Sequence, residues 1–240
     1  MSHAAPKEWR EHKTRHFIIS FKDAPQEVVQ QIGQEAEEVF GQIADNMGLD
    51  SYPNWRSDQR LKIVVYNDQE DYRTSNIKTE HASWSSGMAE YSTHSIKTYP
   101  QQLDYLLNSM VPHELGHFLL MESVGFKADI PGWFSEGIAG MQEKNSPSGE
   151  DRVKKIVDEK GFLSLKDLMR ETMEVSDFYE VSYSATRYLL SRISGTKFNM
   201  FLKQLRNGET FNNALKNVSN GRIKGLDAMN RDWINDIKEH

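Results

Sequence analysis

The apolar residues of this chain change their spacing near residue 102, and this change constrains the fold more than any other feature of the sequence. Before it, the apolar runs His16–Phe21 and Leu61–Tyr66 have the length and β-branched content of strands. From Gln102 onward, apolar residues recur at helical spacing in one segment after another. The sequence therefore predicts an α+β protein, with a small mixed sheet in the first half and a mostly helical second half.

The predicted elements follow one another with short connections and without internal repeats. Strands are expected at 16–21 and 61–66, with weaker extended stretches around 83–91 and 94–99. One long helix is expected over 28–47, ended by Gly48. The later helices are expected at 102–123, 132–144, 150–160, 164–172, 177–194, 197–206, 209–218 and 225–238. We interpret 1–240 as a single domain, with a sheet-containing part at about 14–123 and a helical part at about 124–240.

The composition excludes several classes of protein. The hydrophobic share of 38% is adequate for a buried core, and the formal net charge of −6, with both signs interspersed, offers no basic surface for nucleic acid. No run approaches the roughly 18 apolar residues of a membrane span, and residues 1–16 lack the apolar segment of a signal peptide. We therefore expect no integral membrane segment and no leader in this chain. Because cysteine is absent, a transition-metal site must use imidazole and carboxylate ligands.

Residues 113–117 read His-Glu-Leu-Gly-His, the HExxH pattern, within an apolar segment that is predicted to be helical. A spacing of four residues places His113 and His117 on one face of a helix, where both imidazoles can reach a single tetrahedral zinc ion. Glu114 lies beside them, and a carboxylate there can take a proton from the water that attacks a carbonyl group. The pattern therefore predicts a hydrolytic zinc site with Glu114 as the catalytic base.

Such a site needs a third protein ligand and one open position. The segment 131–139, Pro-Gly-Trp-Phe-Ser-Glu-Gly-Ile-Ala, is predicted to begin a second helix after a short loop. Two helices joined by a short connection can face each other, which makes Glu136 the candidate third ligand. Residues 118–135 separate His117 from Glu136, so the full pattern is HExxH-x18-E. We expect one Zn²⁺ per chain, bound by His113, His117 and Glu136.

Both motifs resemble those of the gluzincin zinc metallopeptidases, in particular the peptidase MA-like domains and the catalytic domain of aminopeptidase N relatives. The resemblance rests on His113–His117 and on Trp133–Ala139 at the family's spacing, and weaker similarity extends from about residue 60 to the C-terminus. It implies a zincin-like (thermolysin-like) fold, the ligands and base already named, and a peptide or protein substrate. Because peptidase MA-like proteins are often exported or membrane-tethered, it also implies an extracytoplasmic location. The oligomeric state stays open.

Two tyrosines are candidates for the group that stabilises the oxyanion formed during hydrolysis. The segment Tyr179–Leu189 resembles the family's helix after the third ligand, which carries a tyrosine, and Tyr179 matches the Tyr-Glu start of that helix. The next residues are Val181 and Ser182 where the family usually has Lys-Gly. Tyr179 is therefore the first choice, and Tyr183, one turn further along the same face, is the alternative.

An extended segment before the metal-site helix is a candidate for substrate binding. In gluzincins such a segment runs along the cleft, and an exposed edge strand can hold a peptide by main-chain hydrogen bonds. We expect Gly87, Met88, Ala89 and Glu90 to form this edge. The segment also resembles the Gly-x-Met-Glu-Asn sequence of aminopeptidases, although Met and Asn are out of register here. Glu90 is therefore a candidate anchor for the free amino group of a substrate.

Two positions depart from the family's pattern. Pro112 removes a backbone donor immediately before His113 and is expected to kink or open the helix there. Gly140 stands where some gluzincins have an acidic residue that supports a metal-bound histidine, so this support must come from elsewhere.

Three functions fit these observations. The first is a zinc metalloendopeptidase, which the intact Glu114 and the short chain favour over the others. The second is an aminopeptidase that uses Glu90 as its amine anchor. The third is a catalytically inactive, zinc-stabilised module that binds extended peptides without cutting them.

Overall fold

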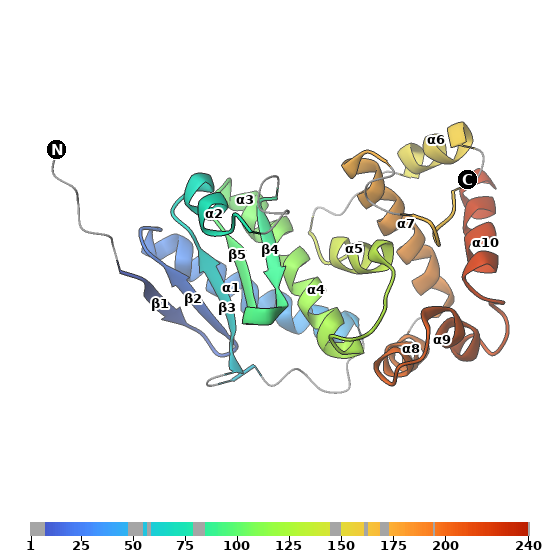
Figure 1. Cartoon of the computed structure of the whole chain (residues 1–240), viewed down its shortest axis with the longest axis horizontal. Helices are drawn as coiled ribbons and strands as arrows, with labels where there is room; N and C mark the ends of the chain where they lie inside the picture. Colours follow the sequence, from blue (N-terminus) through green and yellow to red (C-terminus); the bar gives the residue numbers. More distant parts are fainter. Residues whose placement is uncertain are drawn as a thin grey trace.

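The computed structural model describes residues 8–47, 55–56, 59–78, 85–144, 150–160, 163–168, 173–193 and 195–239. These residues form a small mixed sheet followed by a mostly helical second half, as the sequence predicts (Figure 1). The strands are β1 (Arg10–Lys13), β2 (Phe17–Phe21), β3 (Leu61–Val65), β4 (Gly87–Glu90) and β5 (Ser95–Thr98).

The sheet has the strand order β1-β2-β3-β5-β4. β2, β3 and β5 run parallel to one another, whereas β1 and β4 pair antiparallel at the two edges. Buried and more exposed residues alternate along β2 and β3, which places Phe17, Ile19 and Ile63 in the core. β4 pairs only with β5 among the described strands, so its outer backbone edge can accept another extended chain.

Two long helices pack together beside the sheet. α1 (Gln26–Asn46) contacts β1 and β2, and α4 (Val111–Val124) contacts both α1 and β4. α1 buries residues at helical spacing, including Ile32, Ala36 and Val39, which explains why the sequence predicts it closely. The predicted end at Gly48 lies outside the described residues.

The second half consists of helices that pack around α5 and α7. Figure 1 shows α7 between α5 on one side and α6 and α10 on the other, and each of these three helices contacts α7. The bounds are α5 (Gly132–Gly140), α6 (Glu150–Lys160), α7 (Val175–Arg192), α8 (Thr196–Arg206), α9 (Phe211–Val218) and α10 (Leu226–Glu239). Among the described residues, no helix combines the length and apolar content needed to span a bilayer.

One predicted helix, at 164–172, is wrong over its described part. Residues 163–168 contain no helix, and 169–172 lie outside the described residues. The Leu165 N–H donates to Asn230 Oδ1 at 2.6 Å, and the Leu163 carbonyl accepts from Asn230 Nδ2 at 2.8 Å. A side chain of α10 therefore satisfies this backbone in place of helical hydrogen bonds.

Smaller differences from the predictions have local causes. The predicted helix 132–144 stops as α5 at Gly140 and continues as turns. Neither β1 nor α2 (Gln69–Ser75) was predicted, because β1 is a polar edge strand without apolar alternation and α2 has only two turns. α2 begins with a favourable N-cap residue, Asp68, whose side chain accepts a hydrogen bond from the Asp71 N–H.

Candidate metal centre and cleft

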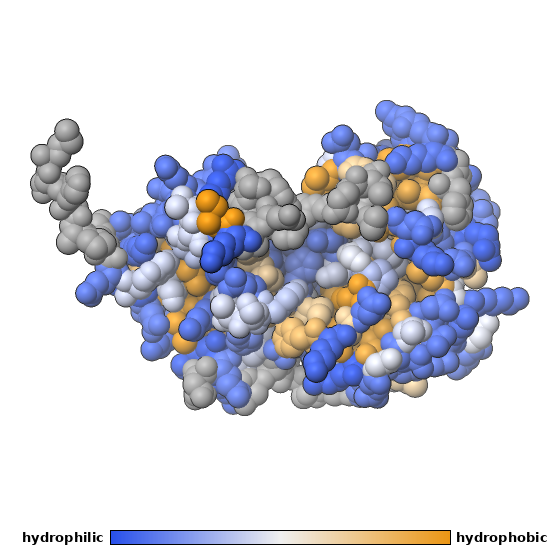
Figure 2. All heavy atoms as spheres, viewed as in Figure 1, coloured by the Kyte–Doolittle hydropathy of each residue, from blue (hydrophilic) through white to orange (hydrophobic). Residues whose placement is uncertain are grey.

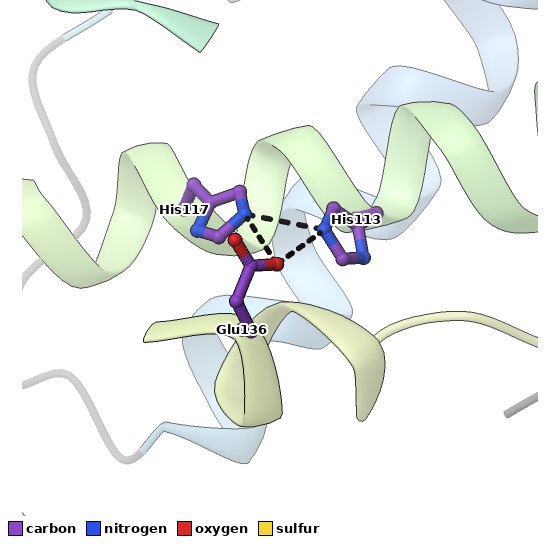
Figure 3. Close-up of side chains that lie close together, drawn as sticks. All are labelled: His113, His117 and Glu136. Carbon is purple, nitrogen blue, oxygen red and sulfur yellow. Dashed lines mark hydrogen bonds and ion pairs between the residues drawn. The ribbon is translucent and has the colours of Figure 1, made fainter. Parts of the chain in front are cut away.

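α4 is a core helix, and His113, Glu114 and His117 of the motif lie on the side that apolar packing leaves partly open. Leu115, Phe118 and Leu119 are completely buried, whereas His113 and His117 are partly exposed. Because the two histidines are four residues apart, their imidazoles lie one turn apart and project on the same side (Figure 3).

α5 is fixed in position by the aromatic residues that precede Glu136. Trp133 and Phe134 are buried against Phe211, with ring centroids 5.8 and 5.1 Å apart, and Phe134 also contacts Phe201. These contacts anchor the first turn of α5 to α8 and α9. Glu136 follows on the side of α5 that faces α4, and its carboxylate lies between the two imidazoles (Figure 3).

The structure brings the three predicted metal ligands together. The Nε2 atoms of His113 and His117 lie 3.2 Å apart, and Glu136 Oε2 lies 3.2 Å from the first and 3.5 Å from the second. Tetrahedral ligands with bonds of about 2.0–2.1 Å to zinc are separated by about 3.3 Å. Oε2 of Glu136 is also buried and has no hydrogen-bond partner among the described residues. Both observations fit a zinc ion held by these three atoms.

The second nitrogen of each imidazole also has a partner. His113 Nδ1 lies 2.8 Å from Glu143 Oε1, and His117 Nδ1 lies 3.0 Å from Ser135 Oγ. With Nδ1–H donating in both contacts, each Nε2 keeps its lone pair for a metal. Glu143 therefore occupies the supporting role that Gly140 cannot fill.

The electrostatics of the cluster favour a bound cation. Burial alone lowers the pKa of His113, but the carboxylates of Glu136, Glu143 and Glu114 outweigh burial and raise this pKa to about 10. Burial likewise raises the pKa of Glu136, and the two histidines reverse this and hold it far below its usual range. The carboxylates thus stabilise positive charge in the place where the three ligand atoms converge.

A cavity of about 380 Å³ opens beside the cluster. It lies between β4, α4, α5 and the start of α7, where Figure 2 shows hydrophilic atoms in a hollow of the surface. Its lining consists of Ser85, Ser86, Gly87, Tyr105, Ser109, Met110, His113, Glu114, Glu136, Gly140, Glu143, Val175 and Tyr179. Three of these residues are glutamates and none of the described ones is Lys or Arg, so the cavity is acidic.

A family comparison agrees with this geometry. The sequence model of the Peptidase MA superfamily matches residues 42–237, which leaves out β1, β2 and most of α1. The chain belongs to the Peptidase MA superfamily. No curated protein sequence matches it. Membership supports metallopeptidase-type hydrolysis and a peptide or protein substrate, as the resemblance of the motifs implies.

Within this Peptidase MA domain, the two candidate tyrosines are placed differently. The ring of Tyr179 packs edge-on against His113, with centroids 5.9 Å apart, and it lines the cavity. The ring of Tyr183 lies against Gly140 of α5, where an added Cβ would be 3.8 Å from Tyr183 Cδ2. Tyr179 is therefore the tyrosine next to the metal ligands.

The predicted edge segment is β4, and only its first residue lines the cavity. Gly87 packs against Met110 so closely that an added Cβ would lie 2.6 Å from the sulfur atom. Met88 is buried, and Ala89 is partly buried. The Glu90 carboxylate lies 2.9 Å from Lys97 Nζ and accepts a hydrogen bond from Thr93. These contacts hold the pKa of Glu90 below its usual value, although burial opposes them.

Two residues of the centre, Glu143 and Ser135, were missed by sequence reasoning. Ser135 directly precedes Glu136 and could have been considered as a hydrogen-bond partner for a ligand. Glu143 lies seven residues after Glu136, a spacing that places both on one face of the predicted helix 132–144, so this spacing was the available signal. In the structure α5 ends at Gly140, and turns bring Glu143 to His113.

Proposed function

We propose that the chain is a zinc-dependent metalloendopeptidase of the HExxH-x18-E gluzincin type, with a thermolysin-like arrangement of its cleft. One observation carries the proposal: three ligand atoms from α4 and α5 converge at tetrahedral spacing, with Glu114 in the wall of the adjoining cavity. His113, His117 and Glu136 would hold one Zn²⁺.

When bound, zinc supplies a Lewis acid that polarises the substrate carbonyl and increases the acidity of water. Glu114 accepts the proton of the attacking water and delivers it to the leaving nitrogen as the C–N bond breaks. The Tyr179 hydroxyl donates a hydrogen bond to the oxygen on which negative charge develops. Glu143 and Ser135 keep both imidazoles in the tautomer and orientation that ligation requires.

The substrate would lie along β4 as an additional antiparallel strand, held by main-chain hydrogen bonds to the free edge. An endopeptidase is favoured over an aminopeptidase because the Glu90 carboxylate is engaged by Lys97 and Thr93. Comparing the same peptide with a free and an acetylated N-terminus tests this choice. Equal cleavage is expected, whereas loss of cleavage on acetylation would support an amine anchor.

The lining of the cavity defines the class of side chain that it accepts. Tyr105 and Val175 expose 44% and 46% of their surface, and Met110 is a buried part of the same lining. With the three glutamates, these residues favour a large neutral side chain and disfavour an acidic one. A substrate with Phe, Leu or Met in the cavity is therefore proposed.

The experiment that tests hydrolysis is substitution of Glu114 by Gln. Peptide cleavage should be lost, whereas zinc content should stay at the wild-type level. Glu122→Gln is the matched control, because Glu122 lies on the same helix and contacts His94, away from the metal ligands. Normal cleavage by Glu114→Gln would remove Glu114 as the base. A zinc-binding wild type that cleaves no peptide would favour the inactive binding module.

We further propose that the chain works as one metallopeptidase domain, because the ligands come from α4, which packs on α1, and from α5, which packs on α7. The extracytoplasmic location implied by the resemblance stays a proposal. Fractionation of cells that produce the protein from its natural gene tests it.

A further inference from the structure

Pro112 lies inside the helical segment that carries the metal ligands, one residue before His113. A proline has no N–H to donate to the carbonyl four residues earlier, which here belongs to Asn108. The preceding segment Leu106–Met110 is a π-helical turn, with the Val111 N–H bonded to the Leu106 carbonyl. Pro112 is therefore accommodated by wider helical turns, and residue 112 donates no hydrogen bond to the Asn108 carbonyl.

That carbonyl is used by a distant part of the chain. The Lys144 N–H donates to Asn108 O at 2.8 Å. The Lys144 side chain is held as well, because Nζ lies 2.8 Å from Glu35 Oε1 on α1. Residue 144 is thus fixed through both its backbone and its side chain.

Glu143 precedes this fixed residue and depends on it for its position. α5 ends at Gly140, and the backbone directly after it forms turns, with the Glu143 N–H donating to the Gly140 carbonyl at 3.3 Å. The Glu143 carboxylate lies 2.8 Å from His113 Nδ1, directly before the residue that is held to Asn108. The Asn108–Lys144 hydrogen bond restrains this stretch of chain on the same helix that carries His113.

We infer that Pro112 is a positioning residue for the metal centre. Because Pro112 has no N–H to donate to the Asn108 carbonyl, this carbonyl accepts a hydrogen bond from the Lys144 N–H. That hydrogen bond in turn positions Glu143 against His113. We call Pro112, Asn108 and Lys144 the latch. The inference rests on the proposed zinc site, and it gives a reason for the proline and for the absence of an acidic residue at Gly140.

The test is a double-mutant cycle on zinc affinity, measured by competition with a chelator. Glu143→Gln should weaken zinc binding by about 10–100-fold, the range for loss of such a partner. Pro112→Ala restores a helical donor for Asn108 and should weaken binding by about three- to tenfold. The double variant should bind zinc no more weakly than Glu143→Gln alone, because the latch acts only through Glu143. Pro25→Ala, at the exposed start of α1, is the control and should leave the affinity unchanged.

A second measurement reports directly on the hydrogen bond from the Lys144 N–H to the Asn108 carbonyl. Amide hydrogen exchange at Lys144 should be faster in Pro112→Ala than in the wild type. Unchanged exchange at Lys144, wild-type zinc affinity of Pro112→Ala, or additive losses in the double variant would each overturn the inference. If the wild type bound no zinc, the proposed function would fail, and exchange at Lys144 would still decide whether the latch exists.

Discussion

Gly116 of α4 lies directly against Ala139 of α5. A Cβ added at Gly116 would be 2.9 Å from Ala139 Cα and 3.0 Å from Gln142 Cγ. Gly116 stands between the two histidine ligands, and this contact sets the separation of the helices that carry His117 and Glu136. The glycine inside the HExxH motif is therefore a packing requirement of the candidate metal centre.

Gly116→Ala is expected to push α5 away from α4. The strain should lower the free energy of unfolding by about 1–3 kcal/mol, and the displaced Glu136 should weaken zinc binding. Denaturant unfolding and chelator competition measure the two effects. Gly132→Ala is the control, since an added Cβ there meets nothing within 4 Å. Equal zinc affinity in both variants would show that the close contact does not set the ligand geometry.

Much of the fold could be predicted because the burial of its elements follows simple periods. Apolar residues that face the core alternate with more exposed residues in Phe17–Phe21, and they recur at helical spacing in α1. The helix predicted over 164–172 was wrong in its described part because the Asn230 side chain of α10 provides hydrogen bonds to the backbone of Leu163 and Leu165. No window of local sequence contains that information.

Some residues of the candidate site could likewise be predicted from local sequence, and others could not. His113, His117 and Glu136 could be predicted because HExxH fixes two ligands on one helical face and a short loop returns the chain. Glu143 was not predicted, although its spacing of seven residues from Glu136 fits one helical face, because turns after the end of α5 at Gly140 bring it to His113. The sequence favoured Tyr179 over Tyr183 but left open which of the two points inward, and the structure places the Tyr179 ring against His113 and the Tyr183 ring against Gly140.

The two tyrosines give a direct comparison. Tyr179→Phe removes the hydroxyl from the ring that packs against His113 and should lower kcat by about 10²–10³-fold, as for other donors to a developing oxyanion. KM and zinc content should change little. Tyr183→Phe, on the next turn of the same helix, is the matched control and should keep near wild-type kcat. A larger loss in Tyr183→Phe would reverse the assignment.

The acidic cavity predicts a preference by charge. In a set of quenched fluorescent peptides that differ at one residue on either side of the cleaved bond, Phe or Leu should exceed Glu in kcat/KM by about tenfold or more. Tenfold corresponds to about 1.4 kcal/mol, a modest like-charge penalty. Val175→Lys adds a positive charge at the exposed rim and should reduce the discrimination, whereas Val175→Met should not. An unchanged ratio in Val175→Lys would place the recognised side chain elsewhere.

The contact between Glu37 and the start of β2 predicts a pH-dependent stability. Burial raises the pKa of Glu37, but hydrogen bonds from Thr14 Oγ1, the His16 N–H and the His16 ring, with the charge of His16, lower it overall. The unfolded state therefore binds a proton more readily than the folded state as pH falls below neutrality. The stabilisation from Glu37 is present at neutral pH and is lost as pH falls through the lowered pKa.

Glu37→Gln imitates the protonated side chain. At pH 7 it should lower the free energy of unfolding by about 1–2 kcal/mol, and the difference from the wild type should shrink toward pH 3. Glu38→Gln, at the exposed neighbouring position, should have little effect at either pH. A difference for Glu37→Gln that stays constant with pH would contradict the assignment.

The proposal that His113, His117 and Glu136 form one zinc site is tested by the metal content of the purified protein, measured beside Glu136→Ala and Glu122→Ala. We expect about one zinc per chain in the wild type and in Glu122→Ala, with a strong reduction in Glu136→Ala. Absence of zinc from the wild type after zinc is supplied at neutral pH, or full zinc content in Glu136→Ala, would contradict it.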